Sequence, residues 1–138
     1  MTGAVGAAHA GWRGTAAQIA RKTVDAMVAT YGCRRGDIRA AIGPNIGQCC
    51  FETDRDVPDA MRRSFGKAAE EYILPKNNKY YVNLKGLNAL QLQQAGVEII
   101  SVSRECTACQ PDRFWSHRRV GALRGSQGAI IVCKEGIR

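Results

Sequence analysis

Apolar and polar positions along this chain follow the spacing of helices separated by short strands. The clearest helical pattern runs from Thr15 to Tyr31, where apolar residues recur every three or four positions and charged residues lie largely off that stripe. Thr15 and Gln18 have the spacing of a capping box, which predicts that the helix begins at Thr15. Gly32 follows the stripe and predicts its end.

The middle of the chain predicts two further helices. The first covers residues 56–65, and the second covers residues 83–95, with Asn83 suited to cap its start. The apolar face of the second helix also carries two amides, Asn88 and Gln91. Because a buried amide needs hydrogen-bond partners, we expect both side chains to be paired inside the fold.

Short apolar runs between the helices predict strands. A brief extended piece is expected at residues 80–82, whereas the polar residues 66–79 predict irregular structure. The four runs that predict buried strands are residues 3–8, 38–42, 97–102 and 128–133. Strands that alternate with helices predict a layered α/β (α+β) fold, and we expect one domain over residues 1–138. The pattern leaves the order of the strands open.

The composition is that of a globular protein with an uneven positive charge. The chain has 45% hydrophobic and 23% charged residues, and its net charge of +8 falls in the terminal segments, because residues 41–103 carry seven Lys/Arg and seven Asp/Glu. A basic surface makes nucleic acid a candidate partner, but no known nucleic-acid-binding motif supports it. An anionic small molecule such as phosphate or a nucleotide explains the charge equally well.

Hydropathy and cysteine content indicate the cellular location that we expect for this protein. No apolar run approaches the ~20 residues of a membrane span, so no membrane partner is expected. The first residues do not have the basic-then-apolar pattern of a signal peptide, and we therefore expect a cytoplasmic protein. Six cysteines in such a chain favour free thiols or a metal role over disulfides.

The stretch HAGWRG, residues 9–14, is the first candidate site. It brings together His9, Trp12 and Arg13 between two glycines, where an apolar run passes into a helical pattern. The start of a helix attracts anions, and an arginine there reinforces the effect. The alternative is a histidine paired with a carbonyl, with Trp12 in the core and Arg13 in an ion pair. From the residues alone the two interpretations are evenly matched.

Cysteines supply the second candidate. Cys106 and Cys109 form a CxxC pattern, but a structural zinc site needs four ligands, and the remaining choices are His117, Cys49, Cys50 and Cys133. Ordinary buried thiols are the simpler interpretation. Cys50 could be a nucleophile only with a base beside it, and His9 and His117 are the sole histidines.

Residues 114–119 (FWSHRR) form the third candidate. Aromatic rings that stack on a base, next to arginines that hold phosphate, are typical of nucleotide pockets. A basic surface turn anchored by Phe114 and Trp115 is an equally good interpretation.

Together these stretches resemble one known family. They are HAGWRG (9–14), IGPNIGQCCFE (42–52), NLKGLNALQLQQAGV (83–97) and CTACQPDRFWSHRR followed by GALRGSQGAII (106–131). The resemblance is to the laccase-domain or multicopper polyphenol oxidoreductase family, also known as purine nucleoside phosphorylase-like proteins and peptidoglycan-editing factors. It covers nearly the whole chain, and HAGWRG and the FWSHRR stretch are its specific motifs.

The resemblance implies a layered fold of mixed β-sheets with outer helices, and an enzyme acting on purine nucleosides. It implies phosphorolysis of adenosine, inosine or methylthioadenosine with inorganic phosphate, and deamination of adenosine by a zinc-activated water. His9 would be a zinc ligand, and Arg13 would hold phosphate or substrate and take part in catalysis. The residues that would line or support the pocket, with catalytic parts for Cys50 and His117, are Trp12, Cys50, Phe114, His117 and Arg118. Copper is the alternative metal, although two histidines are too few for a multicopper cluster.

This chain also departs from the family pattern. The two other implied zinc ligands belong to QVHG-like and ADC-like stretches that precede HAGWRG in the family, and neither stretch occurs here. We therefore expect the C-terminal part of a family domain, truncated at its N-terminal side, with impaired activity and some self-association through exposed core surface. Polyphenol oxidation, hydrolysis of peptidoglycan precursors and nucleic-acid binding are the alternative functions.

Overall fold

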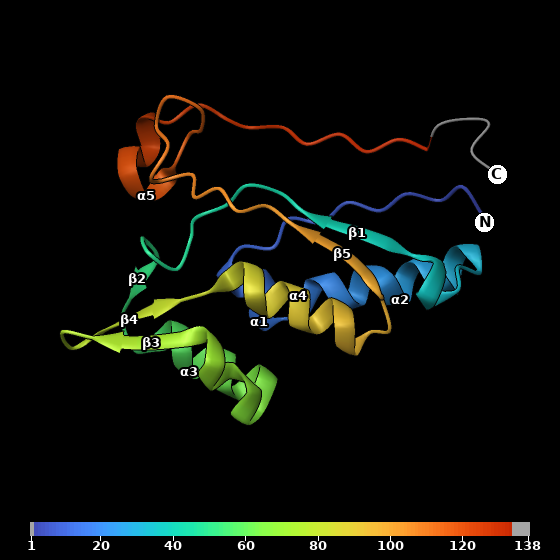
Figure 1. The fold of residues 1–138 in the computed structure, drawn as a ribbon, viewed down its shortest axis with the longest axis horizontal. Coiled ribbons are helices and arrows are strands. Elements are labelled where there is room, and N and C mark those ends of the chain that lie inside the picture. Colours follow the sequence, from blue (N-terminus) through green and yellow to red (C-terminus); the bar gives the residue numbers. More distant parts are fainter. Residues whose placement is uncertain (1, 134–138) are drawn as a thin grey trace.

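A computed structural model describes residues 2–133 as a mixed α/β fold with one parallel and one antiparallel sheet, which confirms the predicted fold class (Figure 1). The helices are α1 (Trp12–Ala16), α2 (Ile19–Tyr31), α3 (Asp56–Phe65), α4 (Leu84–Gln94) and α5 (His117–Val120). The strands are β1 (Arg39–Ile42), β2 (Glu52–Thr53), β3 (Ile73–Lys76), β4 (Lys79–Val82) and β5 (Ile99–Val102). Short 3-10 helices cover Arg35–Asp37, Gly66–Tyr72 and Gly121–Leu123.

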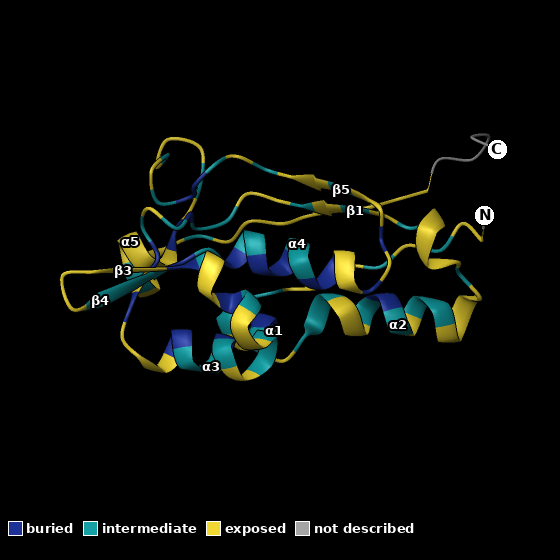
Figure 2. Ribbon diagram, turned by 60° about the horizontal axis from the view of Figure 1, so that its bottom comes forward, coloured by how far each residue is buried: buried dark blue, intermediate teal, exposed yellow. Residues whose placement is uncertain are grey.

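The parallel sheet pairs β1 with β5, with Arg39 opposite Ile99 and Ile42 opposite Val102. Helices α2 and α4 lie on the same side of this sheet (Figure 1). They cover it with a small core made of Val24, Leu92, Ala95 and Val97. The outward-facing positions of both strands are exposed, as Figure 2 shows in yellow. One face of the sheet is therefore packed and the other is open.

The antiparallel sheet has the order β2-β4-β3 and packs with α3 and α4 around the larger core. Its fully buried members include Met61, Val82 and Leu87. Helix α3 has the predicted bounds. Residues 66–79, predicted to be irregular, instead form a 3-10 helix, strand β3 and the turn into β4. That prediction was wrong because β3 is exposed along most of its length, so it lacks the alternation that marks a half-buried strand.

The predicted start of the first long helix was also wrong. Gln18 has left-handed backbone angles (φ 61°, ψ 38°) that separate α1 from α2, and Thr15 caps neither helix. The start of α2 is instead capped by the side chain of Gln91 from α4, whose Oε1 accepts hydrogen bonds from the backbone N–H groups of Ala20 (3.0 Å) and Arg21 (3.2 Å). A residue distant in sequence thus replaces the local cap.

Both amides of α4 have the partners that their burial requires. Asn88 donates to Thr15 Oγ1 at 2.9 Å, and Gln91 donates to Asn88 Oδ1 at 2.9 Å. Asn83 caps the helix by accepting from the backbone N–H of Gly86 at 3.0 Å. These three sequence predictions for α4 are confirmed, and the amides tie α4 to both α1 and α2.

Two predicted strands do not form. Residues 3–8 and 128–133 have no regular secondary structure in the described structure, and neither segment joins a β-ladder. Ile130 is 95% exposed, so the apolar run that suggested a buried strand has no core around it here. An apolar run indicates a strand only where a neighbouring strand and a covering layer are present. Within residues 2–133, no helix combines the length and apolar character needed to cross a bilayer.

Replacing Gly86 by alanine is expected to lower the free energy of unfolding by about 2 kcal/mol. A Cβ at this position would lie 2.5 Å from Cδ1 of Tyr72 and 2.9 Å from Nδ2 of Asn83. This crowding outweighs the gain of about 1 kcal/mol that alanine brings in helix propensity. Urea unfolding followed by circular dichroism measures the change. Gly43→Ala, which would meet nothing within 4 Å, is the control, and equal stability of both variants would contradict the expectation.

Candidate active site

The HAGWRG stretch passes from extended chain into helix α1. Gly11 has extended backbone angles, and Trp12 is the first residue of a helix that is five residues long. The Trp12 ring is half-buried against the larger core, and the guanidinium of Arg13 lies 4.2 Å from its ring centroid. The two side chains therefore form one stacked unit at the surface. His9, three residues earlier, is exposed.

A hollow of about 330 Å³ opens beside Trp12, and we call it the mixed hollow because it carries both charges. Its walls hold two aromatic rings, three carboxylates and two cations. They belong to Trp12, Phe51, Glu52, Thr53, Asp54, Asp56, Val57, Lys79 and Arg118. Aromatic and apolar surface with a few convergent polar groups is the usual composition of a small-molecule site.

Arg118, more than 100 residues after Trp12 in the sequence, also lines the mixed hollow. Its guanidinium lies 5.3 Å from the centroid of the Phe51 ring, and its Nη1 donates to the backbone carbonyl of Glu52 at 2.5 Å. These contacts fix the cation over the start of β2. The structure therefore brings together two of the predicted substrate-binding residues, Trp12 and Arg118, which lie in different motifs.

Ion pairing sets the charge of the mixed hollow. Lys79 Nζ donates to Asp54 Oδ1 at 2.5 Å, and this contact raises the pKa of Lys79, so the amine stays protonated at neutral pH. Tyr81 donates its hydroxyl to Glu52 at 2.6 Å, which raises the pKa of Tyr81 and keeps it a neutral phenol. Asp56 lies in the first turn of α3, where a negative charge is favoured.

A second hollow of about 430 Å³ is lined by residues of α1 and α3, and we call it the basic hollow. It shares Trp12 with the mixed hollow. Both of its charged lining residues are arginines, Arg13 and Arg63, and Ser64 adds a hydroxyl next to them. Two guanidinium groups and a hydroxyl, with no carboxylate in the lining, suit an anion.

The remaining predicted residues lie outside the mixed hollow. Phe114 is half-buried under the guanidinium of Arg113, 5.1 Å from its ring centroid. His117 is exposed at the start of α5, where Arg124 Nε donates to its Nδ1 at 3.4 Å. Their predicted parts in binding and catalysis stay predictions.

Sequence reasoning missed several residues that line the mixed hollow, namely Phe51, Asp54, Asp56 and Lys79. Phe51 directly follows the cysteine pair, and its neighbourhood within IGPNIGQCCFE was the available signal. Lys79 carried no signal, because the strand pairing that delivers it was not predicted.

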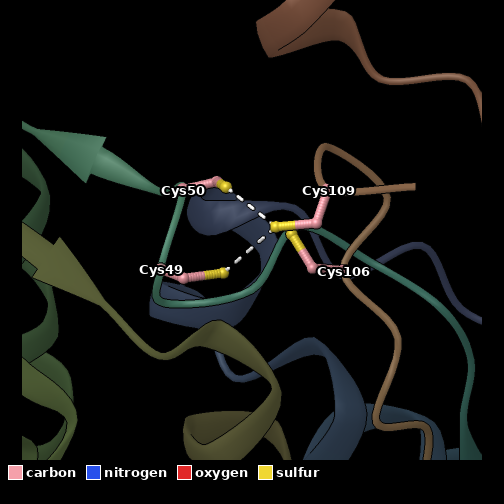
Figure 3. Close-up of side chains that lie close together, drawn as sticks. All are labelled: Cys49, Cys50, Cys106 and Cys109. Carbon is pink, nitrogen blue, oxygen red and sulfur yellow. Dashed lines mark hydrogen bonds between the residues drawn. The ribbon is translucent and has the colours of Figure 1, made fainter. Parts of the chain in front are cut away.

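Cys50 lies within a group of thiols formed with Cys49, Cys106 and Cys109 (Figure 3). Its hydrogen bond to Cys109, at 3.4 Å between the sulfur atoms, and its burial raise its pKa, so the thiol remains protonated at neutral pH. The described residues place no histidine in this group. The catalytic part predicted for Cys50 therefore stays a prediction.

The described residues do not complete a zinc site around His9. Among residues 2–133, His9 belongs to no group of three or more metal-ligating side chains. A catalytic zinc needs three protein ligands, so the described residues alone do not supply a complete site for that metal. The predicted part of His9 as one such ligand is neither supported nor contradicted.

The comparisons with known proteins identify the family. A family model described as multi-copper polyphenol oxidoreductase laccase matches residues 1–134. This chain belongs to that family.

Several relatives of this chain are named as enzymes that act on purine nucleosides. The purine nucleoside phosphorylase YlmD of Bacillus subtilis is 40% identical over 133 residues, which are 95% of this chain and 48% of the relative. The adenosine deaminase RL5 of an unknown prokaryotic organism is 35% identical over 91% of this chain and 48% of its own length. The crystal structure of YlmD from Geobacillus stearothermophilus matches with a TM-score of 0.76 at 41% identity, over 81% of this chain and 43% of that one. This chain thus spans about half the length of these relatives.

Proposed function

We propose that this chain forms part of a site that cleaves purine nucleosides with inorganic phosphate. The names of its relatives support an enzyme of this kind. The observation that carries the proposal is the convergence of Trp12, Phe51 and Arg118 on the mixed hollow. Three motifs from separate parts of the chain meet there, with the chemistry that a nucleoside requires.

The mixed hollow would bind the nucleoside. The rings of Trp12 and Phe51 offer faces on which a purine can stack. The carboxylates of Glu52, Asp54 and Asp56 can accept hydrogen bonds from ribose hydroxyls or from the purine amino group.

The basic hollow would hold the phosphate. Arg13 and Arg63 line it, and Trp12 lines both this hollow and the mixed hollow. In phosphorolysis a phosphate oxygen bonds to ribose C1′ while the bond from C1′ to the purine nitrogen breaks. The purine leaves as the free base. Arginines that fix the phosphate next to the nucleoside lower the barrier by orienting the two reactants.

Deamination of adenosine is the second candidate, and the name of the relative RL5 favours it. In that reaction the oxygen of water bonds to the purine C6 and the amino group leaves as ammonia. A carboxylate can take a proton from the attacking water and pass it to the departing amino group, and the mixed hollow has three carboxylates. Zinc at His9 with copper as the alternative, a cytoplasmic location and self-association remain predictions.

Product analysis tests the proposal. The protein is incubated with inosine, adenosine or methylthioadenosine, with and without phosphate, alone and joined to a segment that carries the QVHG-like and ADC-like motifs. We expect free purine base only when phosphate is present, with more turnover in the joined form. Conversion of adenosine to inosine without phosphate would favour the deaminase. Absence of both products in both forms would overturn the proposal.

A further inference from the structure

The four-thiol group lies beyond the carboxyl ends of the two parallel strands. After β1 and β5 end, their chains stay paired, because Ser103 donates its N–H to the carbonyl of Ile42 at 2.9 Å, and Asn45 bridges Cys106. Lys85 of α4 anchors the second loop by donating to the carbonyls of Ser103 and Glu105, each at 2.9 Å. The carboxyl ends of parallel strands are a common place for binding sites.

Each loop then makes a turn that presents two thiols. In the first turn, Cys50 donates its N–H to the carbonyl of Gly47 at 3.0 Å, and in the second, Cys109 donates to the carbonyl of Cys106 at 3.2 Å. Figure 3 shows the four side chains pointing toward one another from these turns. All four sulfur atoms lie within 4.8 Å of one another, and Cys109 is 3.4 Å from Cys50 and 3.7 Å from Cys49.

These spacings match the coordination shell of one metal ion. Four sulfur atoms bonded at about 2.3 Å to a tetrahedral zinc lie roughly 3.8 Å apart. We propose that Cys49, Cys50, Cys106 and Cys109 bind a single zinc ion as four thiolates. A cluster of several iron and sulfide ions would hold its cysteines farther apart than this, and Ca²⁺ and Mg²⁺ prefer oxygen ligands. The proposal does not depend on the proposed function.

Backbone N–H groups surround one of the four sulfur atoms, that of Cys106. The N–H groups of Gly47, Cys109 and Ala108 are directed at this sulfur, so they can stabilise a negative charge on it. The Gly47 N–H donates to this sulfur at 3.1 Å. A Cβ on Gly47 would lie 3.1 Å from the sulfur of Cys49 and 3.2 Å from Cβ of Cys106, so a glycine lets the two loops approach.

Zinc binding would join the two loops into one rigid unit. The hydrated ion would lose its waters and form four zinc–sulfur bonds, and the protons of the neutral thiols would pass to the solvent. Cys50 directly precedes Phe51, which lines the mixed hollow and lies under Arg118. The ion would therefore be structural and would hold the first loop against the hollow, separate from any metal at His9.

Metal analysis of the purified protein is the direct test. After purification under reducing conditions, elemental analysis and native mass spectrometry should find one zinc per chain, and X-ray absorption should show four sulfur neighbours at about 2.3 Å. Replacement of the zinc by Co²⁺ should give the intense visible bands of a tetrahedral thiolate site. These measurements use the unaltered protein, so they do not depend on how a variant folds.

Variants then identify the ligands. Cys109→Ser should weaken zinc affinity more than about 100-fold in a chelator competition, since outer-shell changes alone cost 10–100-fold. Cys33→Ser and His9→Ala are the controls and should keep the zinc, because neither residue belongs to the group. Protein that contains no zinc, that loses it in His9→Ala, or that is recovered anaerobically with a disulfide between Cys109 and Cys49 or Cys50 would overturn the proposal.

Discussion

Replacing Gln91 by leucine is expected to lower the free energy of unfolding by about 3 kcal/mol, since each buried polar group left without a partner costs about 1–3 kcal/mol. Leucine keeps an apolar side chain of similar size but removes the amide. Three groups then lose a partner, namely the N–H groups of Ala20 and Arg21 and the Oδ1 of Asn88. Equilibrium unfolding in urea, followed by far-ultraviolet circular dichroism, measures the loss.

The matched control is Gln93→Leu on the same helix. Gln93 is exposed, so this change should alter stability by less than about 0.5 kcal/mol. An equal loss in the two variants would show that leucine itself, rather than the broken cap of α2, is responsible. Retention of full stability in Gln91→Leu would contradict the role assigned to the amide.

Arg118→Gln is expected to lower kcat/KM for nucleoside phosphorolysis about 100-fold, because a hydrogen bond to a charged group contributes roughly 1.5–3 kcal/mol. The glutamine can still donate a hydrogen bond, but it removes the cation from the mixed hollow and from the Phe51 ring. Initial rates of base release, measured over a range of nucleoside and phosphate concentrations, give the loss in each parameter.

Arg119→Gln is the control for charge and position. Arg119 adjoins Arg118 and also donates to a backbone carbonyl, that of Ala108 at 3.3 Å, but it lines neither hollow. Its kcat/KM should stay within about threefold of the unaltered protein, a change below roughly 0.7 kcal/mol. Similar losses in both variants would point to general electrostatics and against a binding part for Arg118.

Elements whose cause is local were predictable from the sequence. The pattern of α3 and the cap and inward face of α4 depend on neighbours a few positions away, and the structure has them as predicted. The break between α1 and α2 was not predictable, because its cap comes from Gln91, some seventy positions later. The strands predicted at residues 3–8 and 128–133 were wrong for a related reason. A strand forms only where a partner strand is present, and an apolar run in the sequence does not specify that partner.

The candidate site also has features that the sequence predicts and features that depend on the fold. The motifs that contain Trp12 and Arg118 could be singled out from residue types, because aromatic rings next to arginines suggest nucleotide chemistry. Their meeting at one hollow required the fold. The sequence left open whether Cys49 and Cys50, or His117 and Cys133, would join Cys106 and Cys109 in a metal site. The choice depends on the pairing of β1 with β5, which brings the two loops together and which the sequence does not specify.

The larger core has a consequence for recombination between relatives. Every buried member of that core lies between Phe51 and Leu87, so the contacts that build it are carried by one contiguous stretch. Exchanging residues 51–87 between relatives would transfer the core intact. New contacts between donor and recipient residues would arise where Trp12 and Ile46 pack against that core. The exchanged residues would also carry the walls of the mixed hollow from Phe51 to Lys79, while Trp12 and Arg118 would stay with the recipient. Substrate preference could thus be shuffled separately from the two motifs that frame the hollow.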